Sequence, residues 1–397
     1  MTRLITDTLG NSAWLRDLNL LSELKGFINE TDFKTKWRRS KLTNKERLAD
    51  WLQTKMGIRV STSALFDIQI KRIHEYKRQL LNILSVIWRY RQIKGMSDDE
   101  RADAVPRVVI FAGKAAPGYH IAKLIIKLIN CVSKKINDDP DIEDLLKVVF
   151  IPNYNVSLAE ILIPASDISQ HISTAGTEAS GTSNMKFVMN GGLLLGTLDG
   201  ANVEISEEIG RQNVFIFGTL AHEVENQKQR LREGKHQWDP RLLEVIQLLR
   251  DGVFGVFPEV HQLLDSFVHH HDQYLLSVDW PSYLEAQALV DRTYKNTEKW
   301  TQMSILSTAG MGKFSSDRSI EEYAENIWNL RPCPRPGPIP VDTSAMGQEV
   351  PAVRNFSAGI SPLDIMSPLT GEIALERLSP RDAMKIRSFS PSSSPFF

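Results

Sequence analysis

The chain of 397 residues has only two cysteines, Cys131 and Cys333. Two thiols exclude a disulfide framework and a zinc site built from cysteines, and they fit a reducing compartment. A formal net charge of −1 gives no overall basic surface for nucleic acid. No segment approaches the ~18 consecutive apolar residues of a membrane span, and the first residues lack the apolar core of a signal peptide. We expect a cytoplasmic protein with no nucleic-acid or membrane partner.

The three adjacent histidines at 269–271 raise the question of a metal site. Neighbouring histidines on a helix point in different directions, so at most two of them reach one ion, fewer than a typical zinc site requires. A solvated helix face is the favoured interpretation. We therefore predict no metal.

Short apolar runs rich in β-branched residues alternate with helical patterns along much of the chain. The expected strands are 64–70, 107–113, 147–152, 193–198 and 213–218. This alternation predicts an α/β fold, with a doubly wound, mainly parallel sheet and helices on both faces. Amphipathic patterns after residue 220 predict further helices that cover the sheet.

Composition divides the chain into three predicted parts. Residues 1–58 are mostly helical, and 59–330 form the Rossmann-like domain with its C-terminal helices. Eleven of the 19 prolines lie after residue 330, which predicts a Pro/Ser-rich disordered tail over 331–397.

The loop after the first strand is strongly cationic. It contains Lys71, Arg72, Lys77 and Arg78, which we place in the first turns of a helix. Cations oppose the helix dipole there, so either nearby Asp67 and Glu75 neutralise them or a bound phosphate does. Because ligands of open parallel sheets bind beyond the carboxyl ends of the strands, the phosphate reading is slightly favoured.

The segment GKAAPGYHIAK, residues 113–123, is a glycine and proline turn between a strand and a helix. Tyr119 follows Gly118 where a Walker loop needs a lysine and a hydroxyl residue, and the segment is not G-x-G-x-x-G. A plain strand-to-helix connection is the favoured interpretation.

The segment EASGTSNMKF, residues 178–187, has almost no side-chain bulk before Lys186. Small residues let an anion lie against backbone amides, and the composition predicts a loop that turns into a helix near Lys186. An ordinary surface lysine is the alternative to a partly desolvated, imine-forming one. Together with the cationic loop, the pattern indicates pyridoxal phosphate beside a second anion.

Five segments taken together resemble the α-glucan (glycogen or starch) phosphorylases over residues 1–330: KRIHEYKRQLLN, GKAAPGYHIAK, EASGTSNMKF, GTLDGANVEI and GKFSSDRSI. The resemblance implies a glycosyltransferase with a domain like the C-terminal domain of GT-B enzymes. It implies reversible phosphorolysis of α-1,4-glucan by inorganic phosphate to glucose 1-phosphate, with retention of configuration. It also implies a homodimer of the full-length protein.

The resemblance implies that pyridoxal 5'-phosphate is bound to Lys186 as a Schiff base and that the phosphate of the cofactor acts in catalysis. The residues implied to bind the cofactor are Lys71, Lys77, Tyr154, Gly181, Thr182 and Lys186.

The implied catalytic residues are Arg72, Lys77 and Lys186, with Arg72 and Lys77 holding the substrate phosphate. The terminal glucose would contact Glu178, Ser180 and Gly181.

The resembled family has a large N-terminal domain before this region, so we expect the cofactor-binding half alone, inactive without the rest. Asn155 and His171 resemble plant-type members, and the tail has no recognised counterpart in the family. Two alternatives stay open: a non-catalytic fragment that binds cofactor or pairs with another subunit, and a nucleotide-sugar glycosyltransferase.

Overall fold

The computed structural model describes residues 1–255, 258–268 and 272–330, which belong to one compact unit, Met1–Pro332. The predicted tail over 331–397 and the histidines at 269–271 lie outside the described residues. Within the described ranges, no group of three or more potential ligands is placed to hold a metal ion. No helix in these same ranges is long and apolar enough to cross a membrane.

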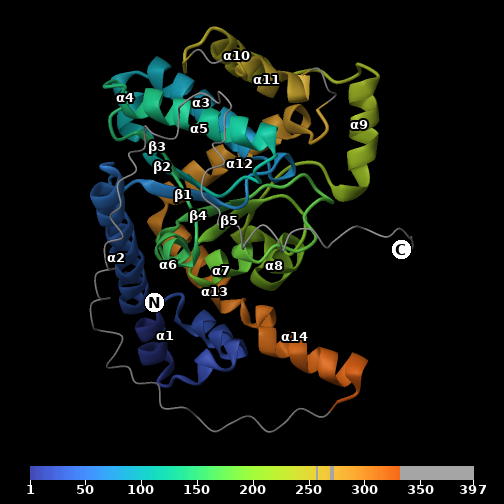
Figure 1. Cartoon of the computed structure of the whole chain (residues 1–397). Coiled ribbons are helices and arrows are strands. Elements are labelled where there is room, and N and C mark those ends of the chain that lie inside the picture. Colours follow the sequence, from blue (N-terminus) through green and yellow to red (C-terminus); the bar gives the residue numbers. More distant parts are fainter. Residues whose placement is uncertain (256–257, 269–271, 331–397) are drawn as a thin grey trace, which may run out of the picture. The chain divides into compact units, whose positions relative to one another are not determined.

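A parallel sheet forms the centre of the unit (Figure 1). Its six strands are β1 (Leu65–Ile70), β2 (Arg107–Ala112), β3 (Leu146–Ile151), β4 (Ile168–His171), β5 (Leu193–Gly196) and β6 (Phe215–Ile216). Their order is β3-β2-β1-β4-β5-β6, with every pair of neighbours parallel. The chain thus winds outward in one direction from β1 and in the other from β4, which confirms the predicted fold class.

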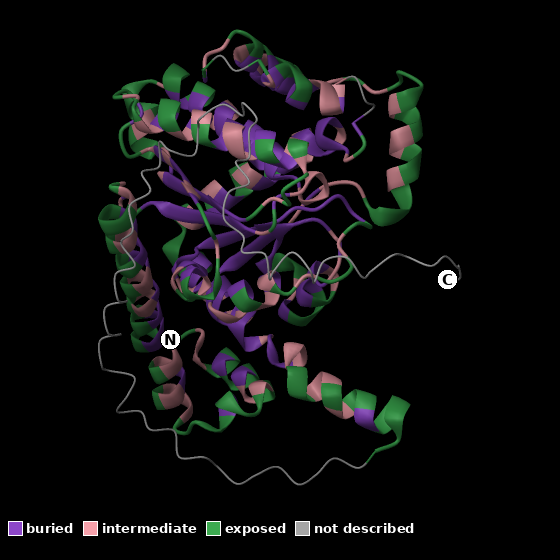
Figure 2. Cartoon of the chain, viewed as in Figure 1, coloured by how far each residue is buried: buried purple, intermediate pink, exposed green. Residues whose placement is uncertain are grey.

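Helices cover both faces of the sheet, and Figure 2 shows the strands buried between them. One face packs against α3 (Gln79–Gly95), α5 (His120–Asn137) and α12 (Leu276–Lys295), while α10 (Pro240–Arg250) and α11 (Val260–Val268) pack on the outer side of α3 and α5 (Figure 1). The other face packs against α2 (Thr31–Met56), α6 (Val156–Ala165), α7 (Ser183–Met189) and α8 (Asn202–Ile209). The predicted C-terminal helices are present, including α13 (Thr297–Ala309) and α14 (Ser316–Tyr323).

The N-terminal helices α1 (Thr2–Leu9) and α2 have a smaller apolar cluster of their own, in which Trp37 packs near Ile305 of α13. The buried Lys45 of α2 donates to Asp167 at 2.6 Å, just before β4. The predicted domain boundary at residue 58 stays a prediction. The remaining short helices are α4 (Asp98–Asp103) and α9 (Val224–Arg232).

Strand β4 was not predicted, because its sequence ISQH is not an apolar run. All four residues are nevertheless buried, and their polar groups bond to one another and to neighbouring strands. Ser169 Oγ donates to Leu193 O at 3.3 Å, and Gln170 Nε2 donates to both carboxylate oxygens of Asp67 at 2.8 and 2.9 Å. Satisfied hydrogen bonds allow a polar strand into the core.

The predicted helix start at Lys71 is wrong. Residues 71–78 form a loop with a single 3₁₀ turn at Glu75–Lys77, and α3 begins at Gln79. The cations therefore lie on a loop at the carboxyl end of β1, before the first turn of α3, and Arg78 is the N-cap residue of that helix.

Candidate phosphate and cofactor site

The candidate site lies where the strand order reverses, between β1 and β4. The chain leaves these neighbouring strands towards opposite faces, an arrangement that in open α/β sheets forms a ligand-binding crevice at the carboxyl ends. The β1 loop, residues 71–78, and the β4 loop, residues 172–182, meet there. Thr174 N donates to Tyr76 O at 3.0 Å and joins the two loops directly.

Arg78, at the end of the β1 loop, connects the two loops through its buried side chain. Its Nε donates to Ile172 O at 2.7 Å, and its guanidinium pairs with Asp279 of α12 at 2.6 Å. The side chain is fully buried, and the backbone has a left-handed φ of 57°, which is uncommon for a residue other than glycine. Arg78 was predicted as part of an anion-binding cluster, but its donors serve the protein itself.

Lys77 and Glu178 form an ion pair across the crevice, with both side chains mostly buried. This contact brings together a predicted phosphate-binding residue and a predicted sugar-binding residue. Lys71 lies beside them: burial, helped by the charge of Lys77 and opposed by Glu178 and Asp199, lowers the pKa of its ammonium to about 8. The structure therefore concentrates two lysines and one carboxylate at the strand switch.

Asp199, which follows β5, fixes the shape of the β4 loop. Its carboxylate accepts bonds from Gly176 N at 2.9 Å, Glu178 N at 2.9 Å and Ser173 Oγ at 2.7 Å. Gly200 packs so close that a Cβ there would lie 2.4 Å from Ser180 O and 2.8 Å from Glu178 O. The motif GTLDGANVEI was recognised in the sequence, but this role of its Asp-Gly pair was not.

The rest of the small-residue loop leads into α7 as predicted. Gly181 has a φ of +80°, and Ser180 and Thr182 are exposed. Asn184 is buried and donates to Asn202 Oδ1 at 2.9 Å, which anchors the start of the helix. Lys186 projects from α7 as an exposed residue. The described residues therefore do not bury its amine, and its role as the imine-forming lysine stays a prediction.

Arg72 and Tyr154 lie at the margins of the site. Arg72 is exposed, while its carbonyl accepts from Gln79 Nε2 at 3.1 Å. Tyr154, in the loop after β3, is half-buried and packs on the apolar cluster that contains Phe187, the neighbour of Lys186. Neither side chain forms an ion pair with another residue in the described part of the chain.

His171, the last residue of β4, was noted in the sequence only as a residue that resembles plant-type members, and no role at the site was predicted for it. Its Nε2 lies 3.0 Å from Ser169 Oγ, while its Nδ1 is buried and, in the described part of the chain, has no hydrogen-bond partner. Burial, together with the charges of Lys71 and Lys77, holds the pKa of His171 well below its usual value. The ring is therefore neutral, with one buried nitrogen still to be satisfied.

The alternative to a bound phosphate was neutralisation of the cationic loop by Asp67 and Glu75, and neither carboxylate forms an ion pair with the loop in the described residues. Asp67 lies within β1 and pairs with Arg107, at the start of β2, at 3.0 Å. Glu75 accepts from the hydroxyl of Tyr119 at 2.6 Å, which joins the β1 loop to the turn after β2. That turn is a strand-to-helix connection, as predicted: Gly113 lets its backbone approach Lys71 O, to which a Cβ would lie at 2.0 Å.

Comparison with known proteins matches residues 1–330 to the family model described as carbohydrate phosphorylase. The chain belongs to this family. It is 49% identical over 393 residues to glycogen phosphorylase 2 of Dictyostelium discoideum, covering 99% of this chain and 38% of the relative. It is 51% identical over 338 residues to the H isozyme of alpha-glucan phosphorylase of Solanum tuberosum, covering 84% of this chain and 40% of the relative.

The family match confirms the resemblance, and two of its details matter. The chain spans about two fifths of the length of these curated relatives. The match to the Dictyostelium relative covers 99% of the chain and so extends into the tail, so the expectation that the tail has no family counterpart is wrong. Relatives named as cytosolic and as chloroplastic or amyloplastic both occur, and the predicted cytoplasmic location stays a prediction.

We predict that Gly200→Ala displaces the β4 loop and lowers the stability of this protein. The added Cβ would meet two backbone carbonyls, and the left-handed φ of +51° adds strain. A cost of about 1–3 kcal/mol in the free energy of unfolding is expected from such strain. Gly118→Ala, where a Cβ meets no atom within 4 Å, is the matched control. Urea denaturation measures both; equal stability of the two variants would contradict the proposed role of Gly200.

Proposed function

We propose that this chain is the cofactor-binding part of an α-1,4-glucan phosphorylase, which releases glucose 1-phosphate from glucan ends. The observation that supports it best is the pairing of Lys77 with Glu178 at the strand switch, beside Lys71, in a member of the carbohydrate phosphorylase family. Cations and a sugar-binding carboxylate in one crevice suit a reaction between a phosphate and a glucan end. The relatives are named as phosphorylases of glycogen and alpha-glucan, which favours this reaction over transfer from a nucleotide sugar.

The donors at the crevice fit pyridoxal 5'-phosphate. Lys71 and the small-residue loop at Gly181 and Thr182 offer an ammonium and open backbone to a phosphate group, and Lys186 offers an amine to an aldehyde. The neutral, unsatisfied His171 Nδ1 beside Lys71 and Lys77 adds a polar group that a ligand there would satisfy. When bound, the cofactor would supply a phosphate that exchanges protons with the substrate phosphate.

The chain's own residues would bind and orient the substrates. Arg72, exposed at the mouth of the site, and Lys77 would hold the inorganic phosphate against the repulsion of a second anion. Glu178, held by Asp199 through its backbone, would accept hydrogen bonds from the terminal glucose, next to Ser180 and Gly181. Tyr154 would line the cofactor pocket from the β3 loop.

The exposure of Lys186, Ser180 and Thr182 bears on what this chain does by itself. Electrostatic stabilisation of two neighbouring phosphates weakens when water enters a site. We therefore propose that catalysis requires a further part of the protein that covers these residues and excludes water. We also propose that the full-length protein is a homodimer. A non-catalytic fragment that binds cofactor is the second candidate, and the same exposure favours it.

We predict that Lys186 is the lysine modified by pyridoxal phosphate. Incubation of the full chain with the cofactor, reduction with borohydride and peptide mapping should place the pyridoxyl group on Lys186, because its exposed amine follows the phosphate-binding loop. Lys186→Ala should abolish the label, while Lys55→Ala, which removes an exposed lysine on α2, should keep it. Labelling of Lys71 or Lys77 in its place would overturn the assignment.

We predict that binding of inorganic phosphate weakens as the pH rises above about 8. The free Lys71 ammonium has a pKa lowered to about 8, so above this pH it loses the proton that attracts the anion. Because binding is linked to one proton, the affinity for inorganic phosphate should fall by at most roughly tenfold for each pH unit between pH 8 and 10. Equilibrium dialysis measures it, and Lys71→Gln should bind weakly with a flatter profile. The same slope in both proteins would exclude Lys71 as the titrating group.

A further inference from the structure

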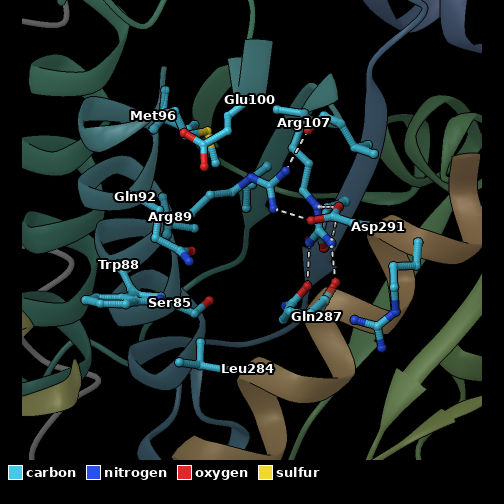
Figure 3. A pocket seen from close by; sticks show the side chains of 18 of the residues that line it. Ser85, Trp88, Arg89, Gln92, Met96, Glu100, Arg107, Leu284, Gln287 and Asp291 are labelled. Carbon is cyan, nitrogen blue, oxygen red and sulfur yellow. Dashed lines mark hydrogen bonds and ion pairs between the residues drawn. The ribbon is translucent and has the colours of Figure 1, made fainter. Parts of the chain in front are cut away.

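A cavity of about 440 Å³ lies near the amino ends of β1 and β2, apart from the candidate site at the carboxyl ends of β1 and β4 (Figure 3). It opens between α3, the segment around α4, α12 and the amino end of β2, where Arg107 begins the strand. Its volume falls in the lower part of the ~300–1,000 Å³ range of small-molecule pockets. None of the residues assigned to the phosphate and cofactor site lines it.

Arg89 of α3 extends across this cavity, as Figure 3 shows. One terminal nitrogen donates to Asp291 at 2.6 Å, and the other donates to Val105 O at 2.6 Å. The Nε is buried and, in the described ranges, has no hydrogen-bond partner. A buried, unsatisfied donor of a charged group is costly, so this N–H calls for an acceptor in the cavity.

The charges that surround Arg89 are already balanced. Arg107 pairs with Asp67 at 3.0 Å and with Asp291 at 2.8 Å, so two arginines face two aspartates. At the rim, Lys295 pairs with Asp103 at 2.7 Å. An anionic ligand next to Arg89 would lie beside the carboxylate of Asp291, which is only 2.6 Å from the guanidinium. The acceptor is therefore expected to be uncharged.

The other polar groups of the lining both donate and accept. The hydroxyl of Ser85 gives its proton to Asn82 O at 2.7 Å, which leaves its oxygen to accept a hydrogen bond. Gln92 lies on the same helix and offers an amide donor and an amide acceptor. Figure 3 shows both residues on one side of the open space and Gln287 of α12 on the other, with Leu284 below.

We propose that this cavity binds a neutral, hydroxyl-rich ligand, a monosaccharide or disaccharide, through Arg89 Nε, Ser85 and Gln92. A sugar hydroxyl accepts from the arginine and donates to the serine at no cost in charge, which neither a carboxylate nor a purely apolar molecule does. This would be a sugar-binding site separate from the candidate site at the strand switch. The proposal does not depend on the proposed phosphorolysis.

Isothermal titration of the full chain with maltose tests the proposal. Ala288 is an exposed residue of α12 that lines the cavity, so Ala288→Trp should fill the opening without breaking an ion pair. Ala102→Trp, on an exposed residue of α4 outside the lining, is the matched control. We expect at least a tenfold loss of maltose affinity in Ala288→Trp, a smaller loss in Gln92→Ala and no change in Ala102→Trp.

Two further measurements make the result decisive. Glu178→Gln, at the candidate site, should leave this maltose binding intact, so that failure of the proposed enzymatic function and failure of this proposal can be told apart. Maltobionate, in which a carboxylate replaces the reducing end, should bind no better than maltose. Absence of maltose binding by the folded wild-type chain, equal binding by all cavity variants, or preference for maltobionate would each overturn the proposal. Thermal melting confirms that every variant is folded.

Discussion

The buried pair of Arg78 and Asp279 is the interaction on which the candidate site depends. Arg78 ends the β1 loop and donates to the carbonyls of Ile172 and Ser173, at the start of the β4 loop. Asp279 in turn accepts from Thr219 N at 2.8 Å, after β6. One guanidinium therefore sets the distance between two loops whose functional side chains are more exposed. Removing either partner would leave a buried charge without compensation, which is strongly destabilising.

A second constraint is that the β4 loop consists largely of residues with small side chains. Side chains such as Ser180 and Thr182 add little bulk, so the shape of the loop comes from outside it, chiefly from Asp199 and Gly200 after β5. This division of roles leaves backbone amides accessible while fixing their position. It also explains how a loop with an exposed surface keeps Glu178 within reach of Lys77. Preorganisation of this kind lowers the cost of binding an anion.

The sequence predicted the fold class and five of the six strands from short apolar runs, and it predicted the helix that begins near Lys186 from the small turn and cap residues before it. It did not predict β4, whose buried Ser169, Gln170 and His171 find their hydrogen-bond partners only in three dimensions. It also counted Arg78 with the anion-binding cations, since nothing local shows that its donors bond to the protein itself. The roles of Lys71, Arg72, Lys77 and Lys186 came from the family resemblance, and the exposure of Lys186 needed the structure.

The most direct test of the account is phosphorolysis by mixed fragments. Glucose 1-phosphate release from soluble glucan would be measured with this chain alone, and then with the separately expressed remainder of the Solanum tuberosum relative, in the presence of pyridoxal phosphate. The account predicts little release by the chain alone, substantial release on mixing, and none when the chain has Lys186→Ala. Substantial release by the chain alone, or release on mixing that survives Lys186→Ala, would contradict it.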